Sequence, residues 1–63
     1  MEGKQIREIR KNYGIKAVVL AKQAGVHYSR LSLIENEHVK PRQDELDRVT
    51  EALSELVKGP TVG

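Results

Sequence analysis

Residues 16–36 read KAVVLAKQAGVHYSRLSLIEN, and this stretch decides the fold. Its first half places Leu20 and three alanines on one face of a helix over residues 16–24, and Gly25 ends that helix. Its second half places Leu31 and Ile34 three residues apart, which indicates a second helix over residues 28–36. Only residues 25–27 separate the two predicted helices, so they must meet at a steep angle.

Two further helices are expected, one before this pair and one after it. Ile6, Ile9 and Tyr13 follow helical spacing in residues 4–13, and Gly14 ends that helix. Arg10 lies on the same stripe, so it must be paired or reach solvent. After a linker over residues 37–41, a last helix over residues 43–57 carries its apolar stripe on Leu46, Val49, Leu53, Leu56 and Val57. The pattern predicts an all-α chain that contains a helix-turn-helix unit.

Length and composition narrow the class of protein. Sixty-three residues hold one domain, and the absence of cysteine excludes disulfides and thiolate metal sites and suits a reducing intracellular compartment. No apolar run approaches the roughly 20 residues that span a bilayer, and the N-terminus does not resemble a secretory signal. We therefore expect a domain over residues 1–58, a disordered tail over residues 59–63, and no membrane partner.

The charge is unevenly distributed along the chain. Residues 1–42 carry nine Lys or Arg against four Asp or Glu, whereas residues 43–63 carry two against five, so +5 and −3 make the net charge of +2. No carboxylate occurs between Ile9 and Ile34. A segregated basic stretch favours contact with a polyanion such as DNA, although a solvated basic face would give the same pattern.

No arrangement typical of catalysis or metal binding stands out. His27 and His38 are eleven residues apart and have no cluster of further ligands nearby. No Ser/His/Asp arrangement of a catalytic triad stands out, and the sequence has no glycine-rich loop of the kind that binds phosphate. We expect no enzyme activity, no cofactor, no metal and no small-molecule substrate.

The sequence resembles the lambda-repressor-like, Cro-type (XRE) helix-turn-helix domains. The matching stretches are IREIRKNYGIK, LAKQAGV, LSLIENE and KPRQDELDRVTEAL, which cover about residues 5–54. The resemblance implies a compact domain of four helices, or five, that binds double-stranded DNA. It also implies an ion pair between Arg10 and Glu35.

The resemblance further implies which residues meet DNA. Base edges would be read by Tyr28, Ser29, Ser32 and Leu33. The phosphate backbone would be contacted by Lys16, Arg30, Asn36, Lys40 and Arg42.

Three positions depart from the family pattern. Ala17 replaces a glutamine that braces the recognition helix, and His27 replaces a Ser or Thr N-cap and is a weaker cap. Glu37 replaces a glycine, so Asn36 is expected to supply the positive φ that ends the helix.

Two functions are compatible with these observations. The first is a sequence-specific transcriptional regulator of the nucleoid, a phage-type or mobile-element repressor that binds an inverted repeat as a homodimer. The alternative is a protein-interaction module on the same fold, with little or no DNA binding. Its partner surface would comprise Val18, Val19, Leu56 and Val57, since the two adjacent valines fall off the apolar face of their helix.

Overall fold

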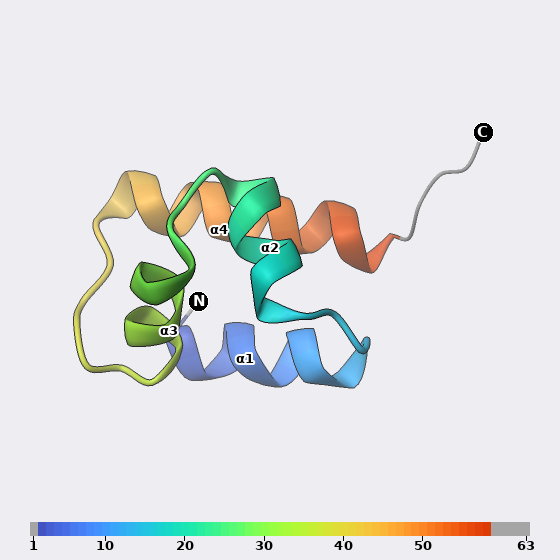
Figure 1. Ribbon diagram of the computed structural model, residues 1–63, viewed down its shortest axis with the longest axis horizontal. Coiled ribbons are helices and arrows are strands. Elements are labelled where there is room, and N and C mark those ends of the chain that lie inside the picture. Colours follow the sequence, from blue (N-terminus) through green and yellow to red (C-terminus); the bar gives the residue numbers. More distant parts are fainter. Residues whose placement is uncertain (1, 59–63) are drawn as a thin grey trace.

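The computed structural model describes residues 2–58 as four helices (Figure 1). These are α1 (Gly3–Asn12), α2 (Ala17–Ala24), α3 (Tyr28–Glu35) and α4 (Gln43–Val57). The described part contains no strand, so the chain is all-α as predicted. Of the two predicted helix counts, four is the number found in this part. The tail over residues 59–63 lies outside the described residues.

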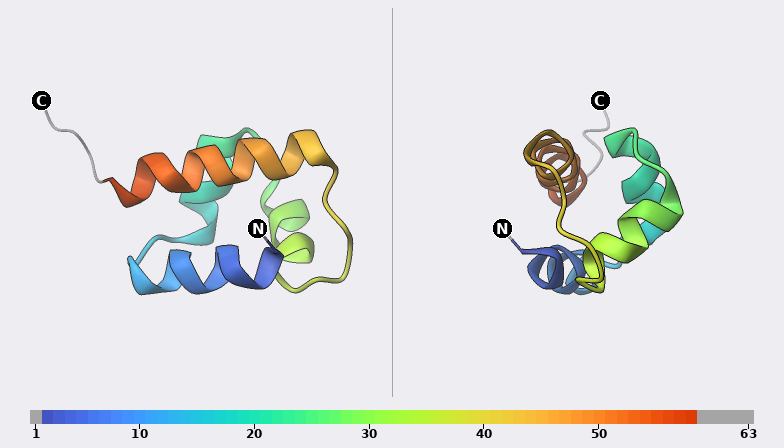
Figure 2. Two further views of the ribbon diagram at one scale, coloured as in Figure 1. Left: turned by 180° about the vertical axis from the view of Figure 1, so that it is seen from behind. Right: turned by 90° about the vertical axis from the view of Figure 1, so that its left-hand side faces the viewer.

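The helices form two packed layers. α1 and α4 run along the length of the molecule, and α2 and α3 cover one side of both, as the end-on view in Figure 2 shows. α2 packs against α4 and α3, and α3 packs against α1. The short turn after α2 therefore leaves α3 at one end of the molecule, where only part of its surface is covered (Figure 1).

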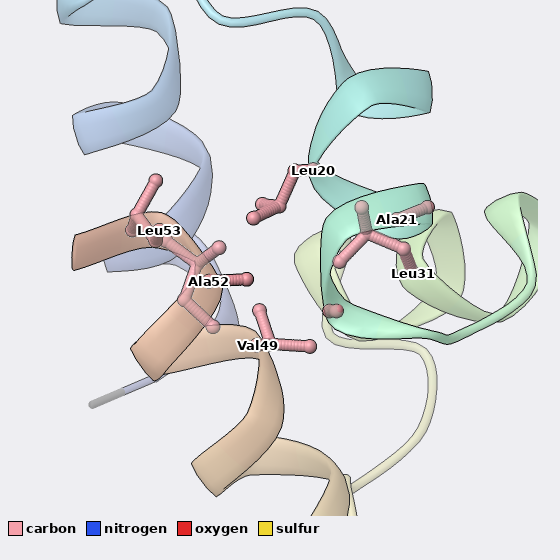
Figure 3. Packing of buried hydrophobic residues seen from close by; sticks show 8 residues of the cluster. Leu20, Ala21, Leu31, Val49, Ala52 and Leu53 are labelled. Carbon is pink, nitrogen blue, oxygen red and sulfur yellow. The ribbon is translucent and has the colours of Figure 1, made fainter. Parts of the chain in front are cut away.

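The core is aliphatic, and all four helices contribute to it. The side chains with less than 2% exposed surface are Ile6, Leu20, Leu31, Ile34 and Val49. Ala21, Ala24 and Ala52 are also buried, and these small residues let α2 lie close to its neighbours (Figure 3).

Tyr13 differs from its predicted place in the apolar stripe of the first helix. Its side chain is 59% exposed because α1 already ends at Asn12 and the backbone turns at Gly14. Ala52 was not among the predicted core positions, although it lies on the same face of α4 as Val49 and Leu53.

The first two turns between helices use the same hydrogen-bonding pattern. The N–H of Ile15 donates to the Arg10 carbonyl, and that of Val26 donates to the Ala21 carbonyl. Gly14 (φ 67°) and Gly25 (φ 72°) hold the left-handed conformation that this Schellman motif requires.

The end of α3 repeats the motif without a glycine, which corrects one expectation. Asn36 keeps φ −86°, and Glu37 takes the left-handed conformation at φ 60°. The reason is helical register, because the Asn36 N–H still bonds the Ser32 carbonyl as a last helical residue. The motif's next two bonds, from Glu37 to Ile34 and from His38 to Leu33, then place the reversal on Glu37.

Gly3 allows the beginning of α1 to lie directly against the end of α3. This glycine is buried, and a Cβ atom added to it would overlap the carbonyl oxygen of Ile34. The contact is between backbones, so it sets the separation of the two helices.

Candidate nucleic-acid interface

α3 has one buried side and one open side. Leu31, Ile34 and Glu35 face the interior. Ser29 and Leu33 are exposed on the opposite side, with Asn36 next to them just beyond the helix. We call these three residues, together with Tyr28 and Ser32, the open face of α3. All four residues predicted to read base edges belong to it; three are exposed and Ser32 is half-buried.

The first turn of α3 is capped by the imidazole of His27. Its Nδ1 accepts a hydrogen bond from the Ser29 backbone N–H at 3.2 Å, and the Ser29 Oγ lies 2.8 Å from the same nitrogen. His27 therefore takes the N-cap role that Ser, Thr, Asn or Asp usually fills. Both side chains are exposed beside the open face of α3.

An ion pair between Arg10 and Glu35 fixes α3 to α1, as the resemblance implied. Arg10 Nε and Nη2 donate to the two carboxylate oxygens at 2.8 and 2.9 Å. Arg10 Nη1 also donates to the Ile15 carbonyl at 2.9 Å. The side chains are only 12% and 5% exposed, so the pair is nearly removed from water. A buried bidentate pair of this kind specifies one helix orientation.

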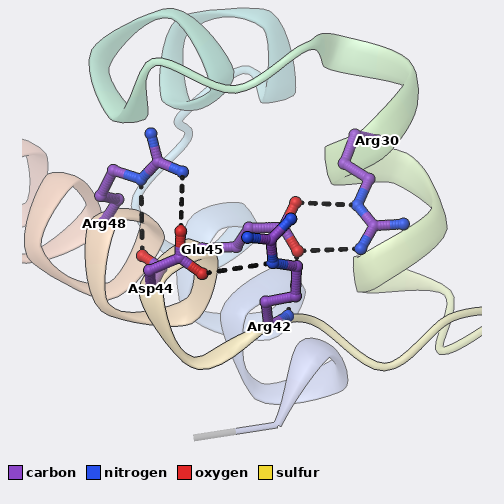
Figure 4. A network of polar contacts seen from close by, with 5 residues as sticks. All are labelled: Arg30, Arg42, Asp44, Glu45 and Arg48. Carbon is purple, nitrogen blue, oxygen red and sulfur yellow. Dashed lines mark hydrogen bonds and ion pairs between the residues drawn. The ribbon is translucent and has the colours of Figure 1, made fainter.

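A second ion pair joins α3 to α4 and was not expected. Arg30 Nε and Nη2 donate to the two oxygens of Glu45 at 2.9 and 2.8 Å (Figure 4). Glu45 Oε1 also accepts the Arg42 backbone N–H at 2.9 Å, which caps α4. Hydrogen bonds from Arg30 and then from Arg42 lower the pKa of Glu45 to about 2. The Arg30 hydrogen bond with Glu45 correspondingly raises the pKa of Arg30.

This pairing changes the view of Arg30 as a phosphate-binding residue. Two of its three guanidinium nitrogens are engaged with Glu45, and Nη1 makes no hydrogen bond to a described residue. Glu45 could not be paired with Arg30 from the sequence, because no helical or turn spacing relates residues fifteen apart. The only sequence signal was that Arg30 falls at the edge of its helix.

The remaining residues predicted to contact phosphates are all exposed. Lys16 precedes α2, and Lys40 and Arg42 lie in or at the end of the segment between α3 and α4. The Arg42 guanidinium lies 3.6 Å from Asp44 and is 76% exposed, so it stays accessible. Asn36 Nδ2 donates to the Ser32 carbonyl at 2.9 Å.

The predicted partner surface divides into two parts. Val18 and Val19 are 58% and 43% exposed on α2. Leu56 and Val57 are half-buried and pack against the core, so less of their surface is accessible to a partner.

Residues 2–58 offer neither a metal site nor a membrane span. No group of three or more His, Asp or Glu side chains in this range could hold a metal ion. None of these four helices has the length and apolarity needed to cross a bilayer.

Comparison with known proteins agrees with this geometry. A family model described as helix-turn-helix matches residues 6–55, which is most of the chain and includes all of α2 and α3. No curated protein and no solved structure gives a match.

Proposed function

This chain belongs to the lambda-repressor-like helix-turn-helix family, and from that membership we propose that it is a sequence-specific transcriptional regulator. In this proposal α3 enters the major groove of duplex DNA. The major groove is about 12 Å wide and admits one α-helix. The proposed domain comprises residues 1–58.

The observation that carries the proposal is the open face of α3. Its exposed residues include hydroxyls at Tyr28 and Ser29, and an isobutyl group at Leu33 that could meet a thymine methyl. Two buried or half-buried ion pairs hold α3 while leaving this face clear. A rigidly held helix with exposed polar groups is suited to reading base edges.

The basic side chains around α3 would position the domain on the backbone. Lys16, Lys40 and Arg42 offer charged donors to phosphates, and the Asn36 amide offers a neutral one. Arg30 would contribute through Nη1 only, because Glu45 holds the other edge of its guanidinium.

The regulator would act as a repressor at the nucleoid and bind an inverted repeat as a homodimer. Two-fold symmetric helix-turn-helix proteins meet half-sites about 10 base pairs apart. Sedimentation of the protein alone and with a selected duplex tests this part of the proposal.

The test of DNA binding is a salt titration of a fluorescent duplex. We expect the logarithm of the binding constant to fall linearly with the logarithm of salt concentration. Arg42→Ala should weaken binding to every duplex and reduce the slope by about 1. Lys58→Ala, at the far end of α4, is the matched control and should change neither. Absence of binding at low salt would refute the proposal.

A protein-interaction role is the second candidate, and the exposure of Val18 and Val19 favours it. In that case Val19→Asp abolishes association with the partner and leaves DNA behaviour unchanged. If Val19→Asp leaves association unchanged in every assay, this candidate function is excluded.

A further inference from the structure

The hydrogen bonds at the start of α3 determine which nitrogen of His27 carries the proton. The Ser29 backbone N–H can only donate, and it points at His27 Nδ1. Nδ1 must therefore present its lone pair, so the proton of the neutral imidazole is on Nε2. The helix cap thus selects one of the two tautomers.

This tautomer in turn determines the direction of the Ser29 hydroxyl. The Ser29 Oγ lies 2.8 Å from Nδ1, which is hydrogen-bond distance. Because Nδ1 carries no hydrogen, the hydrogen between the two atoms must be the hydroxyl's own. Ser29 is a donor to His27, and its oxygen keeps only lone pairs for a ligand.

We propose that His27 makes Ser29 an acceptor-only group on the open face of α3, and so sets which bases the domain reads. This inference rests on the proposed function. In the major groove, exocyclic amino groups are the donors that such an oxygen can meet, and only adenine N6 and cytosine N4 supply them. The acceptor edges of guanine and of thymine O4 offer no hydrogen to Ser29. To donate to them, the hydroxyl must first leave His27.

The first arm of the test is selection of bound sequences from random duplex DNA, followed by titration of single-position variants. Ser29→Ala identifies the base pair that Ser29 reads, since discrimination there should drop by roughly 2- to 10-fold, the worth of one hydrogen bond. Every base pair holds one exocyclic amino group, so the wild-type protein should depend on the adenine N6 or cytosine N4 group of that pair and not on its guanine or thymine acceptors. Replacing adenine by purine, or cytosine by 2-pyrimidinone, removes the amino group and decides between the two sources. The loss of binding affinity caused by the matching base analogue should occur in the wild type and not in Ser29→Ala.

The second arm separates His27 from Ser29. His27→Thr keeps an N-cap oxygen, yet its hydroxyl can donate as well as accept, so Ser29 is freed to turn. We expect this variant still to bind duplex DNA. Its discrimination between base pairs should weaken at the position that Ser29 reads and stay unchanged elsewhere. In the Ser29→Ala background the same substitution should add no further change there.

Nitrogen-15 NMR of the free protein tests the tautomer without DNA. We expect an unprotonated Nδ1 and a protonated Nε2 for neutral His27. A protonated Nδ1 would overturn the inference, and so would a Ser29-dependent preference that survives removal of the amino group from that base pair, or no Ser29-dependent base pair at all. These results leave DNA binding itself intact, whereas failure to bind any duplex overturns the proposed function as well.

Discussion

At the residue scale, the end of α3 carries a conformational cost that the other two turns avoid. Glu37 is the one non-glycine residue with a left-handed φ among residues 2–58. At the ends of α1 and α2, glycines occupy the equivalent positions, Gly14 and Gly25. A side chain with a Cβ atom pays about 1–2 kcal/mol for this conformation. The sequence shows that Glu37 replaces the usual glycine. It does not show that Glu37, and not Asn36, takes the left-handed conformation, because that depends on the backbone hydrogen bonds at the end of α3.

Glu37→Gly should therefore stabilise the protein. We expect a gain of about 0.5–1 kcal/mol in the free energy of unfolding, since the relief of strain exceeds the added flexibility of the unfolded chain. Urea denaturation measures it. Glu37→Ala is the matched control, because it removes the carboxylate and keeps the strain. Equal effects of the two substitutions would show that charge, not backbone conformation, is responsible.

Gly3 should tolerate no side chain. In Gly3→Ala the new Cβ meets the Ile34 backbone, which cannot move without displacing α3. We expect a loss of about 1–3 kcal/mol of stability, typical of overpacking. The exposed neighbour Lys4→Ala should lie within about 0.5 kcal/mol of the wild type. A thermal melt of both variants checks this, and an unchanged Gly3→Ala protein would contradict the close contact of α1 and α3.

At the element scale, two bidentate ion pairs determine how α3 is held. Arg10–Glu35 joins its last turn to α1, and Arg30–Glu45 joins its first half to the beginning of α4. The first pair was implied by the family resemblance, and the position of Arg10 on an apolar stripe agrees with it. The second depends on how α3 and α4 meet in three dimensions, and no local pattern encodes that.

Breaking the buried pair on one side should be costly. Glu35→Ala leaves the Arg10 guanidinium nearly buried without its carboxylate, and we expect a loss of about 3 kcal/mol or more. The double variant Arg10→Met with Glu35→Leu should recover most of that loss, because neither charge then remains. Chemical denaturation of the single and double variants gives the comparison. Additive losses in the double variant would contradict a coupled pair.

The Arg30–Glu45 pair should make stability depend on pH in a defined direction. Folding lowers the pKa of Glu45 from 4.5 to about 2, so its contribution is fully present above pH 4.5. That contribution is lost as the pH falls through about 2. Glu45→Gln should therefore melt at a lower temperature than the wild type at pH 7, and the two melting temperatures should converge between pH 4.5 and 2. A constant difference down to pH 2 would contradict the pairing.

At the scale of the whole molecule, charge is separated between two regions. The exposed Lys40 and Arg42 follow α3 in the chain, with Glu37 before them, whereas the exposed face of α4 presents Asp47, Glu51 and Glu55. Such a separation orients a protein as it approaches a polyanion. We expect the acidic face of α4 to point away from a bound duplex.

Local patterns predicted the helices and the core more completely than the site. The α4 bounds and the buried Leu20, Leu31 and Val49 follow from periodicity alone. The exposure of Tyr13 and the pairing of Arg30 do not, because they depend on where the backbone turns and which helices meet. His27 was expected to be a weak cap, and only its distance to Ser29 reveals the two hydrogen bonds it accepts.

NMR mapping of the complex would locate the DNA-binding surface on the molecule. Backbone amide signals of labelled protein are followed while a bound duplex is added at low salt. We predict the largest changes in Tyr28–Leu33 and in residues 36–42, with the signals of Asp47, Glu51 and Glu55 nearly unmoved. Changes confined to α4 or to Val18 and Val19, with α3 unperturbed, would contradict the account.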